Sequence, residues 1–477
     1  MRGRRRAESL RLLTVAVLAA VALGRVGAQP APPVEPGADR RALYLATFDG
    51  VWSLVADTHF DPELGGVDWN ALRDELRPKA AAATTDRELR RVLDELIGGL
   101  GQSHFAILPR ADAASGEALG LDPDLLPDCA PAVRAEILVA LEAPSAGDSD
   151  PGFVVRVLEE DQVVVTRVAP DGPAAKLGVA TGWRLLAIDG LDLAGHLDCL
   201  AQLGGGRFRH QLVGSWLASL LDGAPRTIAR MRFETADSRR VDLEVRRERG
   251  PGQRVGFGDL PPSRFHFEVE EAETPRGARV GVVRFNLWLL PVAPAFEQAM
   301  PALRAADAVV IDLRGNPGGV AMIAQGVASH FVAEALSLGS LKSRRDHLEL
   351  VVEPRRVARD GTRVEPHGGP LAILVDRGTA STSELFAAGL RDHGRARLFG
   401  APTAGAALPA ITDRLPNGDV FLHASMDYIR PNGEPVEGRP LVPDVEAELT
   451  REDLVAGRDA ALHAALAWID QELKEKR

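Results

Sequence analysis

The sequence predicts a multidomain α+β protein with a helical N-terminal region, a β-rich module and a C-terminal α/β domain whose sheet is largely parallel. Three patterns carry this prediction. Apolar residues recur at i, i+3, i+4 spacing over 40–110, as in amphipathic helices. Strand-like runs separated by turns fill 152–248. Apolar strands then alternate with helical patterns over 279–450, the order typical of parallel sheets.

The first 28 residues are predicted to be a signal peptide. A basic start, MRGRRR, precedes the apolar run LLTVAVLAAVAL and the small-residue site Val26-Gly27-Ala28. The run is shorter than the roughly 20 residues that a membrane helix needs. We therefore expect an exported protein, periplasmic or secreted, with no stable membrane insertion after cleavage; an uncleaved N-terminal anchor is the alternative.

Composition limits the partners and cofactors. Without residues 1–28, which hold six arginines and one glutamate, 50 basic and 66 acidic residues remain, a net charge of −16. Such a surface argues against nucleic acid as a partner. Cys129 and Cys199 could form a disulfide in an exported protein, and the sequence leaves this open. Two cysteines make a poor metal site, and no motif indicates a cofactor.

The domain boundaries follow from shifts in composition. A Pro-rich linker is predicted at 29–39 and an N-terminal helical domain at 40–151. The β-rich module is placed at 152–250, and it includes a short helix and a closing hairpin. The α/β domain is placed at 260–477 and ends in an amphipathic helix.

Ser381 lies between a predicted buried strand, LAILV, and a predicted helix that begins at Thr382. The first N–H groups of a helix have no intrahelical partner, and the helix dipole favours negative charge there. A serine at this turn could act as a nucleophile beside donors for an oxyanion. Ser381 followed by Glu384 is also a capping box, which needs no chemistry, and the two interpretations are compatible.

Three further segments carry candidate site residues. The loop Asp312–Gly319 lacks the Lys-Ser/Thr of a nucleotide P-loop. It is either a plain strand-to-helix turn or a source of an N–H donor at Gly318 or Gly319, beside the N–H of Thr382. His104, next to Ser103 on a loop after a helix stop, suits a general base. Glu437 is a candidate for the acid that orients this base.

Together, VVIDLRGNPGG, VDRGTASTSELFAAGLRDHGRARLFGAPTAG and VEGRPLVPDVE resemble the carboxyl-terminal processing (tail-specific) serine protease family. The segment GFVVRVL…GPAAKLGVATGWRLLAIDG resembles the PDZ domain of that family. GLGQSHF resembles the histidine segment of its tricorn-core-like branch. The resemblance covers essentially the whole chain after the signal peptide.

The resemblance implies roles for individual residues. Ser381 matches the family nucleophile. The usual lysine base follows a Pro-Thr-x-Gly turn, but Ala406 occupies that position here. In the tricorn-core-like branch the base is a histidine preceded by a serine, with a distant glutamate behind them, and His104, Ser103 and Glu437 match that arrangement. Gly318, Gly319 and Thr382 would then lie around the oxyanion.

The implied function is an exported serine endopeptidase that cuts near the C-termini of proteins or peptides. The PDZ-like module would capture a C-terminal carboxylate or gate the catalytic domain. Two alternatives stay open. A non-catalytic peptide-binding protein on the same fold is favoured by Ala406, and an esterase is opposed by the lack of a G-x-S-x-G elbow around Ser381.

Overall fold

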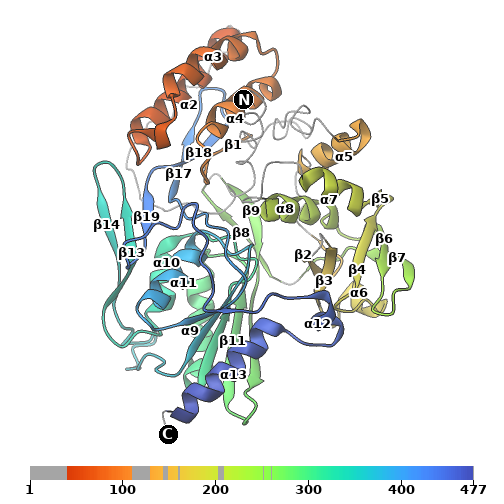
Figure 1. Cartoon of the computed structure of the whole chain (residues 1–477), viewed down its shortest axis with the longest axis vertical. Helices are drawn as coiled ribbons and strands as arrows, with labels where there is room; N and C mark the ends of the chain where they lie inside the picture. The colour runs from red at the N-terminus through yellow and green to blue at the C-terminus, as the bar shows by residue number, and fades with distance from the viewer. Residues whose placement is uncertain are drawn as a thin grey trace.

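The computed structural model describes residues 40–109, 129–142, 149–158, 162–201, 209–250, 252–258 and 260–475 (Figure 1). The predicted signal peptide and linker lie outside these residues. Within the described ranges, no helix is both long and apolar enough to cross a bilayer.

The N-terminal region is helical, as predicted. It comprises α2 (Arg40–Thr58), η1 (Leu64–Gly66), α3 (Trp69–Ala82) and α4 (Asp86–Gly98). Thr85 caps the N-terminus of α4, where its side chain accepts the Glu88 N–H. The apolar stripe of α4 packs into the core that α2 and α3 share. The short strand β1 (Ala106–Leu108) follows and pairs antiparallel with β18 (Val420–Ala424). The N-terminal helical region is thereby attached, through β1, to a strand of the C-terminal region.

The middle region is β-rich, as predicted, and its sheet has the order β2-β3-β4-β6-β7. The predicted closing hairpin is β6–β7. Helix α8 was not predicted; it buries Val213, Trp216 and Leu217 in the core of this region. The elements are α5 (Pro131–Glu142), β2 (Phe153–Leu158), β3 (Gln162–Val168), α6 (Pro173–Lys176), β4 (Arg184–Ile188), β5 (Leu191–Asp192), α7 (Leu193–Ala201), α8 (Arg209–Leu221), β6 (Ile228–Glu234) and β7 (Arg240–Arg246).

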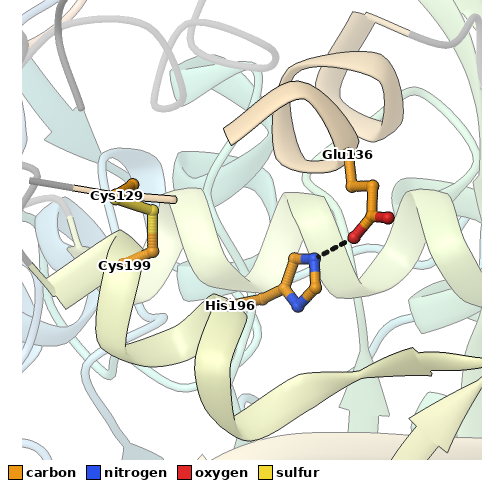
Figure 2. Close-up of a disulfide and its surroundings, with 4 residues drawn as sticks. All are labelled: Cys129, Glu136, His196 and Cys199. Carbon is orange, nitrogen blue, oxygen red and sulfur yellow. Dashed lines mark hydrogen bonds and ion pairs between the residues drawn. A yellow bond between two sulfur atoms is a disulfide. The ribbon is translucent and has the colours of Figure 1, made fainter. Parts of the chain in front are cut away.

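A disulfide joins α5 to this region (Figure 2). Cys129, just before α5, bonds Cys199 on α7, with their Cα atoms 5.5 Å apart. On the same two helices, the Glu136 carboxylate lies 2.8 Å from Nε2 of His196. The pairing that the sequence left open is therefore made, because α5 and α7 pack side by side.

Removal of this disulfide is expected to destabilise the β-rich region. The bond closes a loop over a sequence separation of 70, for which loop-closure entropy gives about 4 kcal/mol. The double variant Cys129→Ala/Cys199→Ala should therefore lower the urea midpoint of unfolding relative to the oxidised wild type. Wild type treated with reductant serves as the matched control and should move by a similar amount. An unchanged midpoint in both would contradict the expectation.

The C-terminal region contains a sheet of order β10-β11-β12-β15-β16-β20. All pairs except β10–β11 are parallel, which confirms the predicted largely parallel sheet. Alternate residues of β12 enter two different cores: Val309 and Ile311 face α9, α10 and α11, whereas Val310 faces α13. Helices therefore cover both faces (Figure 1).

The elements of this region follow in chain order. They are β8 (Gln253–Phe257), β9 (Leu260–Phe265), β10 (Phe267–Glu273), β11 (Arg279–Phe285), α9 (Val292–Ala305), β12 (Ala308–Asp312), α10 (Ala321–Ala328), β13 (Leu336–Lys342), β14 (His347–Val352), β15 (Leu371–Val375), α11 (Thr382–Asp392), β16 (Arg397–Gly400), β17 (Ala410–Arg414), β18, β19 (Asp427–Ile429), β20 (Val445–Glu446), α12 (Arg451–Val455) and α13 (Ala460–Glu475). Strands β12 and β15 are neighbours, so the loops after their carboxyl ends lie together, which is where open α/β sheets bind ligands.

Candidate active site

Ser381 lies between β15 and α11, where the sequence predicts it. Its backbone has φ 55° and ψ −121°, a conformation that non-glycine residues seldom adopt and that surrounding contacts must hold. The Ser381 N–H donates to the Ala406 carbonyl at 2.8 Å and to the Glu384 carboxylate at 3.1 Å. The Glu384 contact is one half of the predicted capping box. The turn therefore fixes the position of Ser381, which is 7% exposed.

The glycine loop after β12 packs directly against this turn. Gly318 has φ 106°, and a β-carbon built on it would lie 2.7 Å from Cβ of Ser381 and 3.0 Å from the Thr382 nitrogen. Gly319 is equally confined, because its β-carbon would lie 2.3 Å from the Trp288 carbonyl oxygen. Only glycine therefore allows the loop to approach Ser381 this closely.

The two predicted oxyanion donors differ in availability. The Gly318 N–H already donates to Oδ1 of Asn316 at 3.0 Å, so it reaches a substrate only by leaving or sharing that oxygen. The Thr382 N–H is the first of helix α11 and has no intrahelical partner. The sequence did not single out Asn316, whose side chain binds the Gly318 N–H. Its position inside the glycine motif, before Pro317, could have pointed to it.

His104 lies on the loop between α4 and β1, and its side chain belongs to a hydrogen-bonded relay. Nδ1 of His104 is 2.6 Å from Oγ of Ser103, which donates to the Glu437 carboxylate at 2.7 Å. The Ser103 N–H donates to the other Glu437 oxygen at 3.0 Å. The structure thus brings together the three residues that the sequence grouped as base and orienting pair.

This relay fixes the tautomer of His104. A carboxylate only accepts, so Oγ–H of Ser103 points to Glu437, and the same oxygen accepts the proton on Nδ1 of His104. Nε2 is then left with a lone pair. It is buried, and no hydrogen-bond partner contacts it among the described residues. Burial lowers the pKa of His104 to about 3, so the ring is neutral at physiological pH.

Residues 405–407 connect Ser381 with the relay. The carbonyl of Ala406 accepts the Ser381 N–H, and the N–H of Ala407 donates to Glu437 at 3.2 Å. The side chain of Ala406, in the position where the resemblance would place a lysine, is fully buried against Ala380 and Ala404. This position therefore contributes backbone groups and no ionisable side chain.

Residues 279–447 match the model of peptidase family S41. Residues 41–98 match the model of the Tricorn protease C1 domain. The S41 segment contains Gly318, Ser381 and Glu437, whereas the Tricorn C1 segment ends before the loop that carries Ser103 and His104.

Two of the curated relatives are named as serine proteases. A "Probable CtpA-like serine protease" of Staphylococcus aureus is 27% identical over 191 residues, which cover 39% of this chain and 37% of the relative. One of Staphylococcus haemolyticus is 23% identical over 291 residues, which cover 60% and 50%. The chain thus spans half or less of these relatives.

Two solved structures share the fold. The photosystem II D1 C-terminal processing protease has a TM-score of 0.52 at 20% identity and covers 88% of this chain and 98% of its own. Mature CPAF complexed with lactacystin has a TM-score of 0.56 at 13% identity and covers 91% and 99%.

Gly318→Ala in the S41 segment is expected to lower any hydrolytic activity at Ser381 by about 100-fold or more. The new methyl group would collide with Cβ of Ser381 and strain a backbone at φ 106°. Gly326→Ala is the matched control, because this exposed glycine lies inside α10 and its β-carbon would meet nothing within 4 Å. The control should keep full activity and an equal or higher melting temperature. Wild-type activity in Gly318→Ala would show that the loop does not border the reaction centre.

Proposed function

We propose that this chain is a serine endopeptidase that hydrolyses peptide bonds near the C-termini of proteins or peptides. Its catalytic residues would be Ser381, His104, Ser103 and Glu437. The single observation that carries the proposal is Nε2 of His104, which is buried and has no hydrogen-bond partner in the part of the chain that the structure describes; the tautomer leaves it a lone pair for the serine proton. The S41 match and the CtpA-like relatives support a serine peptidase. Cleavage near C-termini is suggested by the name of the D1 processing protease.

The proposed mechanism is acyl transfer. Nε2 of His104 takes the proton as Oγ of Ser381 attacks the peptide carbonyl, and it returns the proton to the leaving amine. Water then hydrolyses the acyl-enzyme by the same route. The imidazolium formed in each step keeps its Nδ1–H on Ser103, and Glu437 stabilises that positive charge through the serine hydroxyl.

The resting pKa of His104, about 3, describes the empty site. Negative charge develops on the substrate oxygen as the proton moves, and an opposite charge nearby favours the imidazolium. The N–H groups of Thr382 and of Gly318 or Gly319 would hold that oxygen. Each such donor is worth roughly 3–4 kcal/mol in related sites.

The region 152–250 would act as the PDZ-like module that receives the substrate C-terminus by strand addition. A contact supports communication with the site: Arg156 of β2 donates to the Asp376 carboxylate at 2.5 Å and to the Arg314 carbonyl at 2.8 Å. Asp376 follows β15, and Arg314 belongs to the glycine loop. We further propose that the protein acts after export, periplasmic or secreted, which the disulfide supports.

A fluorophosphonate probe tests the proposal without knowledge of the substrate. The wild type should be labelled on the peptide that contains Ser381, and Ser381→Ala should not react. A non-catalytic peptide-binding protein, which Ala406 favours, would leave both unlabelled. Paired peptides with a free or an amidated C-terminus test the substrate class, and equal cleavage of both would refute recognition of C-termini.

A further inference from the structure

The carboxylate of Glu384 is a buried hub beneath the nucleophile. It is 0% exposed and accepts four hydrogen bonds from two segments of the chain. The donors are the Ser381 N–H (3.1 Å), Oγ1 of Thr403 (2.5 Å), the Gly405 N–H (2.8 Å) and the Ala406 N–H (2.9 Å). A helix cap needs only the first of these, so three contacts remain to be explained.

All four partners are neutral donors, and no cation forms an ion pair with Glu384 among the described residues. Each contact therefore requires an accepting oxygen, and protonation of the carboxyl would break at least one of them. Tyr428 and Glu437 are ionisable groups near the hub. Tyr428 donates its hydroxyl to backbone carbonyls, and Glu437 lies on the far side of 405–407. Burial raises the pKa of Glu384 to about 7 against the four donors, which lower it.

Hydrogen bonds of residues 405–407 link the Glu384 carboxylate to Ser381 and to Glu437. Ala406 donates its N–H to Glu384 and accepts the Ser381 N–H, while the next N–H along the chain, from Ala407, reaches Glu437. Gly438 donates its N–H back to the Gly405 carbonyl at 2.9 Å. A shift of 405–407 would therefore move the nucleophile and the relay relative to each other.

We propose that Glu384 is a positioning residue that holds Ser381 in register with the His104–Ser103–Glu437 relay through residues 405–407. This inference rests on the proposed function and extends the role of Glu384 beyond a helix cap. Ser381 keeps its position relative to the relay while the Glu384 carboxylate is ionised, and it loses that position when the carboxylate is protonated. The reactivity of Ser381 should therefore fall as the pH drops below about 7, the pKa of Glu384. This pH is far above the pKa of His104, which is about 3.

The test is the rate of fluorophosphonate labelling from pH 5 to 9. We expect the wild type to show an acid limb near pH 7. Glu384→Gln should react at least 10-fold more slowly at pH 8 and lose that limb, because the amide neither titrates nor accepts all four bonds. Thr403→Ala removes one donor to the carboxylate and should move the limb to higher pH.

Asp470→Asn is the matched control. This carboxylate on α13 accepts from Thr274 at 2.9 Å and is remote in the sequence from every site residue, so the variant should follow the wild-type profile. Circular dichroism establishes that each variant is folded.

Wild-type labelling rate and acid limb in a folded Glu384→Gln variant would overturn the inference. If that variant does not fold, an unmoved limb in Thr403→Ala overturns it instead. A wild type that labels without any acid limb near neutrality would also contradict it. Failure of the wild type to label at all would overturn the proposed function, so the two failures are distinguishable.

Discussion

His104→Ala is expected to lower kcat/KM for peptide hydrolysis by about 10⁴-fold or more. The alanine removes the nitrogen proposed to take the Ser381 proton, and it also removes the ring that contacts Oγ of Ser103. The relay serine and glutamate then have nothing to orient. The residual rate should come from binding and the oxyanion donors alone, so KM should change little while kcat falls.

The control for this variant is His393→Gln. His393 is an exposed histidine that caps the C-terminal end of α11, and Nε2 of its ring lies 2.8 Å from the Ser337 carbonyl oxygen. It should retain wild-type kcat and KM. Active-site titration with fluorophosphonate separates a slow enzyme from a small fraction of contaminating protease. Full activity in His104→Ala would overturn the assignment of the base and require another proton acceptor.

Asp419→Ala is expected to lower the free energy of unfolding by about 3–5 kcal/mol. The Asp419 carboxylate and the Arg90 guanidinium form a bidentate pair at 2.8 Å, and their side chains are 0% and 1% exposed. Truncation of Asp419 removes both of these hydrogen bonds from an arginine that stays charged inside the protein. Urea unfolding followed by tryptophan fluorescence measures the loss.

Two variants control for the burial of this pair. Lys79→Ala removes an ion pair with Glu95 whose side chains are 46% and 44% exposed, and it should leave the unfolding midpoint unchanged. The double variant Arg90→Met/Asp419→Leu should be more stable than Asp419→Ala, because it removes both members of the pair instead of one. A midpoint for Asp419→Ala equal to that of Lys79→Ala would contradict a structural role for the buried pair.

Much of the candidate site could be predicted because its residues lie in short motifs. Ser381 stands at a strand-to-helix junction that local patterns define, and the serine beside His104 is adjacent in sequence. The parallel sheet was predictable for the same reason, since each βα unit carries its own pattern of apolar residues.

The remaining features depend on packing between distant segments. The Arg90–Asp419 pair joins residues 329 positions apart, and no periodicity marks it. The disulfide required α5 and α7 to be adjacent, which composition does not determine. The hydrogen bond between the Gly318 N–H and Asn316 depends on the loop conformation. The sequence therefore could not show that this predicted oxyanion donor is already engaged.

The three-residue pairing of β1 with β18 has a consequence for when the protein can act. The ribosome makes the proposed base long before the proposed nucleophile. The loop of the base is held by segments made much later, because β1 pairs with β18 and Ser103 binds Glu437. In a nascent or partly unfolded chain the proposed nucleophile would therefore lack its proton acceptor, and the proposed catalysis would begin only after these segments have folded together.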